Sequence, residues 1–142
     1  MAVSRVFWDT NLFIYLFEGS PAFGPQVVAL RQKMLKRGDE LLTSTLTLGE
    51  VLVKPMKLGD GILTNEYRRS IPATATLLQF DEKAAILYAK LRCDAALRAP
   101  DAIQLACAAS FGVDLFVTND GRLHGKQVDG IQFITPLDRV PI

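Results

Sequence analysis

Histidine and cysteine are scarce in this sequence of 142 residues, which contains one histidine, His124, and two cysteines, Cys93 and Cys107. A single histidine argues against a histidine-rich metal centre and weakens any Ser-His or Cys-His mechanism. The cysteines have no CxxC spacing and fall within helix-like apolar patterns, so we expect buried, reduced thiols and neither a disulfide nor a zinc site. The remaining candidate chemistry is that of carboxylates.

A large charge excess and a long apolar run are also missing. Lys and Arg number 16 and Asp and Glu 15, so any attraction for phosphate must be local. No apolar run reaches the roughly 18–20 residues that cross a bilayer. The apolar stretch near the N-terminus is interrupted by Asp9, Thr10 and Asn11, which is unlike a signal peptide. We therefore expect a cytoplasmic protein without a membrane segment.

The stretch 5–17 organises the rest of the chain. Its apolar residues 6–8 run into Asp9-Thr10-Asn11, and a second apolar run follows. This pattern predicts a buried strand whose end caps a helix. Asp9 would then lie at the carboxyl end of an interior strand, where open parallel sheets bind ligands. On local evidence alone, a helix cap explains Asp9 equally well.

Predicted strands and helices alternate through the remaining sequence. Further strands are predicted at 40–44, 74–80, 113–118 and 131–134. Helices are predicted at 26–37, 84–91 and 100–111, and a short one around 67–69. A further helix is predicted to begin with Thr45 or Thr47 as its N-cap and to kink or end at Pro55. The hydrophobic content of 49% suits one sizeable core. We predict a single α/β domain over residues 1–142, with a central, mostly parallel sheet flanked by helices in an α/β/α sandwich.

Four carboxylates occupy comparable positions in this pattern. Asp9 and Asp120 directly follow predicted strands, Glu50 lies in the first turn of a helix that follows a strand, and Asp101 opens a buried helix. In a parallel sheet all four can converge on one edge. Their mutual repulsion would raise their pKa values unless a cation relieved it. An all-oxygen ligand set suits Mg²⁺ or Mn²⁺, and Mg²⁺ also binds phosphate oxygens, which indicates phosphoryl or phosphodiester chemistry.

The motifs that carry these acids resemble the signature of the PIN-domain ribonucleases. They are Asp9-Thr10-Asn11, Glu50, Pro100-Asp101-Ala102 before an Ala-rich helix, and Thr118-Asn119-Asp120. Each motif is short, and their order and spacing carry the signal. The resemblance extends from the first predicted strand to the last, and it is strongest to the small VapC-type toxins of toxin–antitoxin pairs.

The resemblance implies a metal-dependent endoribonuclease in which metal-activated water hydrolyses the RNA phosphodiester bond. Its catalytic, metal-binding acids would be Asp9, Glu50, Asp101 and Asp120. Of these, Asp9 and Asp101 would be direct Mg²⁺ or Mn²⁺ ligands, and the other two would complete the site directly or through water. The Thr10 hydroxyl and the Asn119 amide would orient the ligands. The family also implies a homodimer that is held inactive by a cognate antitoxin protein.

Basic residues near the predicted site are candidates for contact with the RNA substrate. They are Lys54, Lys57, Arg68, Arg69, Arg98 and Arg122. For each, a solvated surface charge is the commoner explanation.

Other functions remain open. One is an RNA-processing PIN nuclease without an antitoxin, and another is a PIN module that binds RNA or protein without cleavage, although such a module has no reason to keep four acids together. A phosphotransferase is disfavoured because Asn11 stands where its second aspartate would be. A receiver domain is disfavoured because an early pair of adjacent acids is missing.

Overall fold

The computed structural model describes residues 3–142. All strand pairings of its single five-stranded sheet are parallel, in the order β3-β2-β1-β4-β5. The strands are β1 (Arg5–Trp8), β2 (Glu40–Ser44), β3 (Thr76–Leu78), β4 (Val113–Val117) and β5 (Ile131–Thr135). The predicted α/β fold with a parallel central sheet is therefore confirmed.

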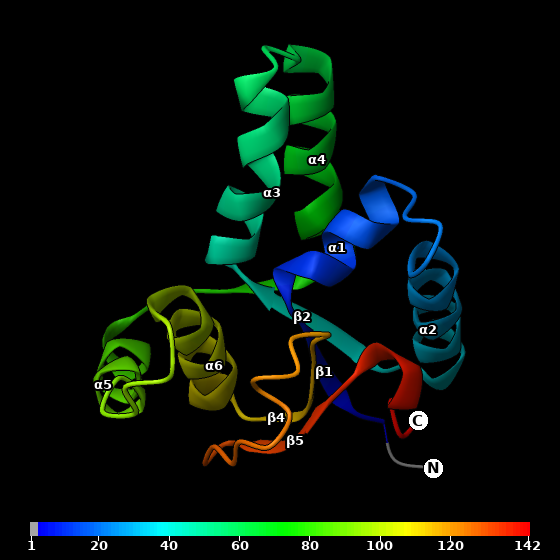
Figure 1. Cartoon of the computed structure of the whole chain (residues 1–142). Coiled ribbons are helices and arrows are strands. Elements are labelled where there is room, and N and C mark those ends of the chain that lie inside the picture. The colour runs from blue at the N-terminus through cyan, green and yellow to red at the C-terminus, as the bar shows by residue number, and fades with distance from the viewer. Residues whose placement is uncertain (1–2) are drawn as a thin grey trace.

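Within residues 3–142, six helices and one short 3-10 helix surround the sheet. They are α1 (Thr10–Phe17), α2 (Gly24–Arg37), α3 (Thr45–Lys57), α4 (Gly61–Thr74), α5 (Glu82–Leu91), α6 (Ala99–Phe111) and η1 (Leu137–Arg139). Figure 1 shows α5 and α6 on one side of the sheet and α2 on the other, with α3 and α4 side by side as a hairpin that stands out from the sheet. None of the helices described is long and apolar enough to cross a membrane.

The central strand β1 is buried on both faces because helices cover both sides of the sheet. Phe7 packs into the core shared with α5 and α6, whereas Val6 and Trp8 pack into the core shared with α1 to α4. All three side chains have no exposed surface. This agrees with the continuous apolar run expected of a strand inside a parallel sheet.

Helix α3 differs from its sequence prediction in two respects. Its N-cap is Ser44, whose hydroxyl accepts a hydrogen bond from the Thr47 N–H, so Glu50 lies in the second turn and not the first. A kink or an end was predicted at Pro55, and the helix does not end there but continues to Lys57. The ring of Pro55 is buried in the hairpin that α3 forms with α4, and this packing outweighs the lost backbone hydrogen bond.

Other boundaries were predicted less well. The strand predicted at 74–80 is only Thr76–Leu78, and the brief helix predicted around 67–69 is the 14-residue α4, with Pro72 inside it.

Both cysteines are free, as predicted, and Cys107 is buried. Cys93 is exposed, because it lies beyond the end of α5, so the prediction of two buried thiols is wrong for this residue.

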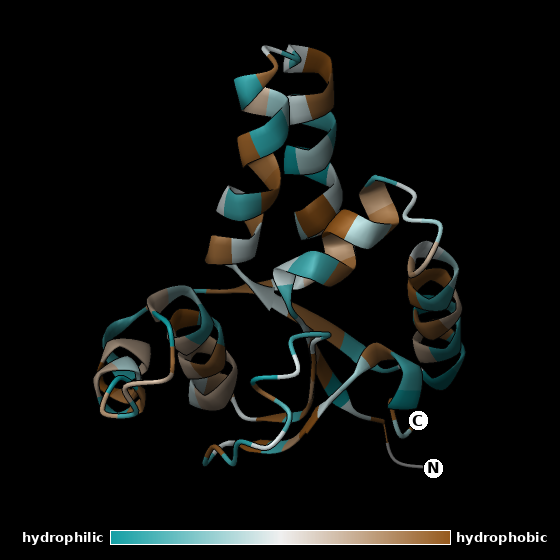
Figure 2. Ribbon diagram, viewed as in Figure 1, coloured by the Kyte–Doolittle hydropathy of each residue, from teal (hydrophilic) through white to brown (hydrophobic). Residues whose placement is uncertain are grey.

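The hairpin of α3 and α4 carries apolar side chains that the core does not cover. Figure 2 shows hydrophobic segments along its outer part. Leu58 is 69% exposed and Ile62 is 85% exposed. Large apolar side chains grouped in this way are typical of an interaction surface.

Candidate active site

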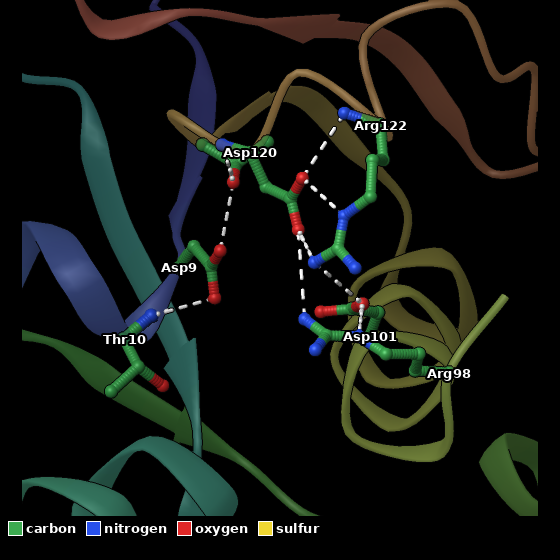
Figure 3. A network of polar contacts seen from close by, with 7 residues as sticks. Asp9, Thr10, Arg98, Asp101, Asp120 and Arg122 are labelled. Atoms are coloured by element: carbon green, nitrogen blue, oxygen red, sulfur yellow. Dashed lines mark hydrogen bonds and ion pairs between the residues drawn. The ribbon is translucent and has the colours of Figure 1, made fainter.

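Strand register places Asp9 beside Thr118. In the parallel pair of β1 and β4, Trp8 is opposite Val117, and the Asp9 N–H continues the ladder to the Val117 carbonyl at 3.1 Å. The residues that directly follow the two strands, Asp9 after β1 and Thr118 after β4, therefore lie side by side and their side chains are in contact. Asp9 caps α1 by accepting the Thr10 N–H through Oδ1 at 2.8 Å, and its Oδ2 accepts the Thr118 hydroxyl at 2.8 Å. Both carboxylate oxygens are thereby fixed (Figure 3).

Burial raises the pKa of Asp9 above its usual range. Hydrogen bonds from Thr118 and Thr10 oppose this rise, whereas the charges of Asp101 and Glu50 add to it. Asp101 and Glu50 are far from Asp9 in the sequence, and their charges act on its pKa because folding brings them close to it. Asp9 therefore lies in the negative field of Asp101 and Glu50.

All four predicted acids line one cleft of about 490 Å³. Its lining consists of Asp9, Thr10, Asn11, Ile14, Glu50, Val53, Arg98, Pro100, Asp101, Gln104 and Asp120. Glu50 reaches it from α3, where its Oε1 accepts the Thr10 hydroxyl at 2.7 Å. Asp101 reaches it from the first turn of α6, and Asp120 from the loop after β4. The structure thus brings together the four carboxylates that the sequence placed at one sheet edge.

Two arginines pair with Asp101 and Asp120 on the outer side of this cleft, Arg98 from its lining and Arg122 from beside it. Arg122 donates to both oxygens of Asp120, at 2.9 and 2.5 Å, and its Nη2 lies 4.0 Å from Asp101. Arg98 donates to Asp101 at 3.4 Å and lies 3.9 Å from Asp120. The hydrogen bond from Arg122 is the main reason why the pKa of Asp120 is below its usual range. Figure 3 shows both guanidinium groups beside the carboxylates of Asp101 and Asp120, joined to them by ion pairs.

The predicted orienting residues differ in what they contact. Thr10 connects two acids, because its N–H binds Asp9 and its hydroxyl binds Glu50. The Asn119 amide oxygen accepts the N–H of Leu137, the first residue of η1, at 3.0 Å and so holds the start of that helix. Thr118, which the sequence presents only as the first residue of the Thr118-Asn119-Asp120 motif, fixes Asp9 from the position directly after β4.

Of the six basic residues proposed for RNA contact, Arg98 and Arg122 lie at the acids. Lys54 forms an ion pair with Glu18 at 3.0 Å. Lys57, Arg68 and Arg69 are exposed on the α3–α4 hairpin. These three are not among the described residues that line the acidic cleft.

Gln104 is the residue that sequence reasoning missed most clearly. It is 2% exposed, lines the floor of the cleft and binds the hydroxyls of Thr10, Thr47 and Ser44. A possible signal was available, because Gln104 follows Asp101 by three positions and is a lone amide in a helix segment of small and apolar residues.

The donor set has the chemistry of a Mg²⁺ or Mn²⁺ site. It consists of carboxylate and hydroxyl oxygens, and the charges of Asp101 and Glu50, which add to the burial that raises the pKa of Asp9, are ones that a cation would relieve. Within residues 3–142, however, no three His, Cys, Asp or Glu side chains are arranged to hold a metal ion. Asp101 and Asp120 are turned toward the arginines, so a bound cation would have to compete with two guanidinium groups.

Comparison with known proteins gives one family and several similar folds. The family model of the PIN domain matches residues 6–128. A chain in the crystal structure of DNA-bound VapBC from Salmonella typhimurium has a TM-score of 0.73 and 21% identity, over 95% of this chain and 99% of that one. A chain of VapBC2 from Rickettsia felis, bound to a DNA fragment from its promoter, has a TM-score of 0.71 and 15% identity, over 93% and 98%.

A toxin-antitoxin complex from Klebsiella pneumoniae contains a further similar chain, with a TM-score of 0.62 and 24% identity over 89% of this chain and 95% of that one. At these identities the likeness concerns the fold. No curated protein sequence matches the chain.

Proposed function

The chain belongs to the PIN domain family, and on that premise we propose that it is a Mg²⁺- or Mn²⁺-dependent endoribonuclease and the toxin of a toxin–antitoxin pair. The observation that carries the proposal is the convergence of four carboxylates, from four separate segments of the chain, on one cleft at the carboxyl edge of the sheet. This is the place where open parallel sheets bind ligands.

Asp9 and Asp101 are the proposed direct ligands of the cation, and Glu50 and Asp120 complete the site directly or through water. When bound, such a cation lowers the pKa of water and stabilises the negative charge that develops on a phosphate. No histidine or serine nucleophile is required for this hydrolysis.

The protein's own contribution is to orient these groups. Thr118 and the Thr10 N–H hold both oxygens of Asp9, and the Thr10 hydroxyl holds Glu50. Arg98 and Arg122 are exposed on their outer sides, at 61% and 58% of their side-chain surface. Their guanidinium groups can therefore bind phosphate oxygens of an RNA strand at the mouth of the cleft.

Cleavage of a panel of structured RNAs tests the nuclease. The purified protein is assayed with Mg²⁺, with Mn²⁺ and with EDTA, beside the variant Asp9→Asn. Cutting that requires metal and disappears in the variant supports both the activity and the site. Absence of cutting, together with absence of Mn²⁺ binding in a calorimetric titration, would contradict the proposal.

A cognate antitoxin is the proposed protein partner, and a homodimer is the proposed assembly. Support comes from the folds of the VapBC and toxin-antitoxin structures and from the exposed Leu58 and Ile62 of the hairpin. Co-expression with the product of an adjacent small reading frame tests the partner, since a stable complex that suppresses cleavage is expected. Sedimentation of the protein alone tests the dimer.

A non-catalytic binding module is the second candidate, because arginines already neutralise Asp101 and Asp120. RNA binding that persists in EDTA without any cleavage would favour it. A PIN nuclease without an antitoxin would instead cleave RNA and have no partner encoded beside it.

A further inference from the structure

Beneath the acidic cleft, Gln104 connects three separate segments of the chain. It lies one turn after Asp101 on α6 and is 2% exposed. Its Nε2 lies 3.0 Å from the Thr10 hydroxyl of α1 and 2.8 Å from the Thr47 hydroxyl of α3. Its Oε1 accepts the hydroxyl of Ser44 at the end of β2. One buried side chain therefore joins the helix that carries Asp101 to the segments that carry Asp9 and Glu50.

The directions of these hydrogen bonds follow from what each group can do. A carboxylate only accepts, and an amide nitrogen only donates. The single hydroxyl proton of Thr10 therefore points to Glu50, at 2.7 Å, and the Thr10 oxygen accepts from Gln104. Ser44 supplies its proton to the amide oxygen, which leaves both amide protons of Gln104 for Thr10 and Thr47.

Packing alone does not explain a glutamine at this place. Its neighbours Leu105, Ala106 and Cys107 show that this part of α6 accommodates apolar side chains. An apolar side chain of similar length would fill the space without losing hydrogen bonds to water, whereas a buried amide is costly unless its donors and acceptor are all used. Here all of them are used, and one of the donors is used on Thr10, which itself donates to Asp9 and to Glu50.

We propose that Gln104 is a positioning residue of the acidic cleft. It holds the Thr10 hydroxyl in the orientation that donates to Glu50, and it fixes the first turn of α6, with Asp101, against the ends of β1 and β2. The inference rests on the proposed metal-dependent nuclease, because it assigns Gln104 to the preorganisation of that site.

Calorimetric titration with Mn²⁺, in the absence of RNA, tests this role on the full chain. Gln104→Met keeps the length of the side chain and removes its hydrogen bonds. Because loss of a group that orients a metal ligand commonly costs about 10–100-fold in affinity or activity, we expect Mn²⁺ binding to weaken by that factor. The kcat for RNA should fall similarly, while KM should stay unchanged.

Cys107→Ala is the matched control, since Cys107 is equally buried on the same helix, at 2% exposure. It packs into the core that α5 and α6 share with Phe7 and does not line the acidic cleft. Cys107→Ala should lower the thermal stability without changing the Mn²⁺ affinity. Gln104→Leu provides a second apolar side chain if Gln104→Met does not fold.

Thr10 variants show whether Gln104 acts through this hydroxyl. Thr10→Ser keeps the hydroxyl and should retain Mn²⁺ affinity, whereas Thr10→Val removes it. Combining Thr10→Val with Gln104→Met should weaken binding by less than the two single effects added together, because both changes remove the hydrogen bond between Gln104 and Thr10, while Gln104→Met also removes those to Thr47 and Ser44.

The outcomes separate the two proposals. If the unmodified protein binds Mn²⁺ and a folded Gln104→Met or Gln104→Leu variant binds it equally well, the role of Gln104 is contradicted and the proposed function stands. If both effects in the double variant simply add, an action through Thr10 is contradicted. If the unmodified protein binds no Mn²⁺ and cleaves no RNA, the proposed function fails, and the positioning role fails with it.

Discussion

The two sides of the acidic cleft stabilise their carboxylates by different means. On the inner side, Asp9 and Glu50 accept hydrogen bonds from neutral donors, the hydroxyls of Thr118 and Thr10 and one backbone N–H. On the outer side, Asp101 and Asp120 are paired with exposed arginines. Neutral donors hold a carboxylate in place and leave its negative charge, whereas an arginine cancels that charge.

This difference predicts how the two sides would treat a cation. The inner side is preorganised and keeps its charge, so it should supply most of the affinity. The outer side must first release its guanidinium groups. These exposed ion pairs are weak individually, so their release is possible, and the released arginines could then contact phosphate.

The largest expected effect comes from removing the inner carboxylate. Asp9→Asn should lower RNA cleavage by more than about 100-fold, which exceeds the usual loss for an orienting residue. Single-turnover cleavage in Mn²⁺ measures it. Asp114→Asn is the control, because Asp114 binds the Arg5 N–H near the opposite end of β4. An equal loss of cleavage in Asp9→Asn and Asp114→Asn would show that the loss results from impaired folding and not from damage to the acidic cleft.

Removing a neutral donor should have the next largest effect. Thr118→Val leaves Asp9 without the hydroxyl that fixes its Oδ2, and we expect Mn²⁺ affinity and cleavage to fall by about 10–100-fold. Thr135→Val is the control, since the Thr135 hydroxyl is buried at the end of β5 without a hydrogen-bond partner among the described residues. Full affinity in Thr118→Val would mean that the inner side is not held by its hydroxyls.

Removing the arginines should act in the opposite direction on metal binding. The double variant Arg98→Gln/Arg122→Gln uncovers Asp101 and Asp120, so Mn²⁺ should bind about 2- to 30-fold more tightly, the range expected when two exposed ion pairs no longer compete with the cation. RNA should bind more weakly. Lys126→Gln, which removes the 2.6 Å ion pair with Asp94, should change neither. Unchanged Mn²⁺ affinity in the double variant would contradict the proposal that the arginines on the outer side of the cleft compete with the cation.

The smallest effect concerns stability in the absence of metal. Because the pKa of Asp9 is raised on folding, the folded state binds more protons than the unfolded state between the unfolded value of about 3.9 and the folded one. Stability therefore falls as pH rises through that interval. In EDTA, Asp9→Asn should melt a few degrees higher than the unmodified protein near pH 7, and this gain should disappear below the ordinary pKa of aspartate.

Asp120 provides the contrast for that experiment. Its pKa is lowered, mainly by Arg122, so its contribution to stability is present above the unfolded pKa and is lost as pH falls through the folded one. Asp120→Asn should therefore give no gain near pH 7. Thermal unfolding followed by circular dichroism over this pH range distinguishes the two aspartates.

Much of the fold was predictable because the relevant patterns are local. The apolar run 6–8, the capping residues Asp9 and Asp81, and the Pro100 and Gly112 that bracket α6 lie within a few residues of the elements they define. The errors concern elements whose form depends on distant contacts. Pro55 remains inside α3 because of the hairpin with α4, and Cys93 is exposed because α5 ends before it.

The candidate site was predictable in its acids and not in what holds them. Asp9 and Asp120 follow strands, Asp101 opens a helix and Glu50 lies early in one, and a parallel sheet gathers such positions at one edge. The contacts between Thr118 and Asp9 and between Gln104 and Thr10 join residues 109 and 94 positions apart. Their existence depends on strand register and on the packing of α6, which no local pattern specifies.

The sequence by itself therefore determined the α/β class, the parallel arrangement and the four carboxylates, because apolar periodicity and capping residues act over a few positions. The tertiary structure alone decided that Asp9 and Glu50 are held by neutral hydroxyls, that Asp101 and Asp120 face arginines, and that Gln104 joins the segments beneath them. The physical reason is that hydrogen bonds and ion pairs depend on distances of a few ångströms, which only the complete packing of the sheet and helices sets.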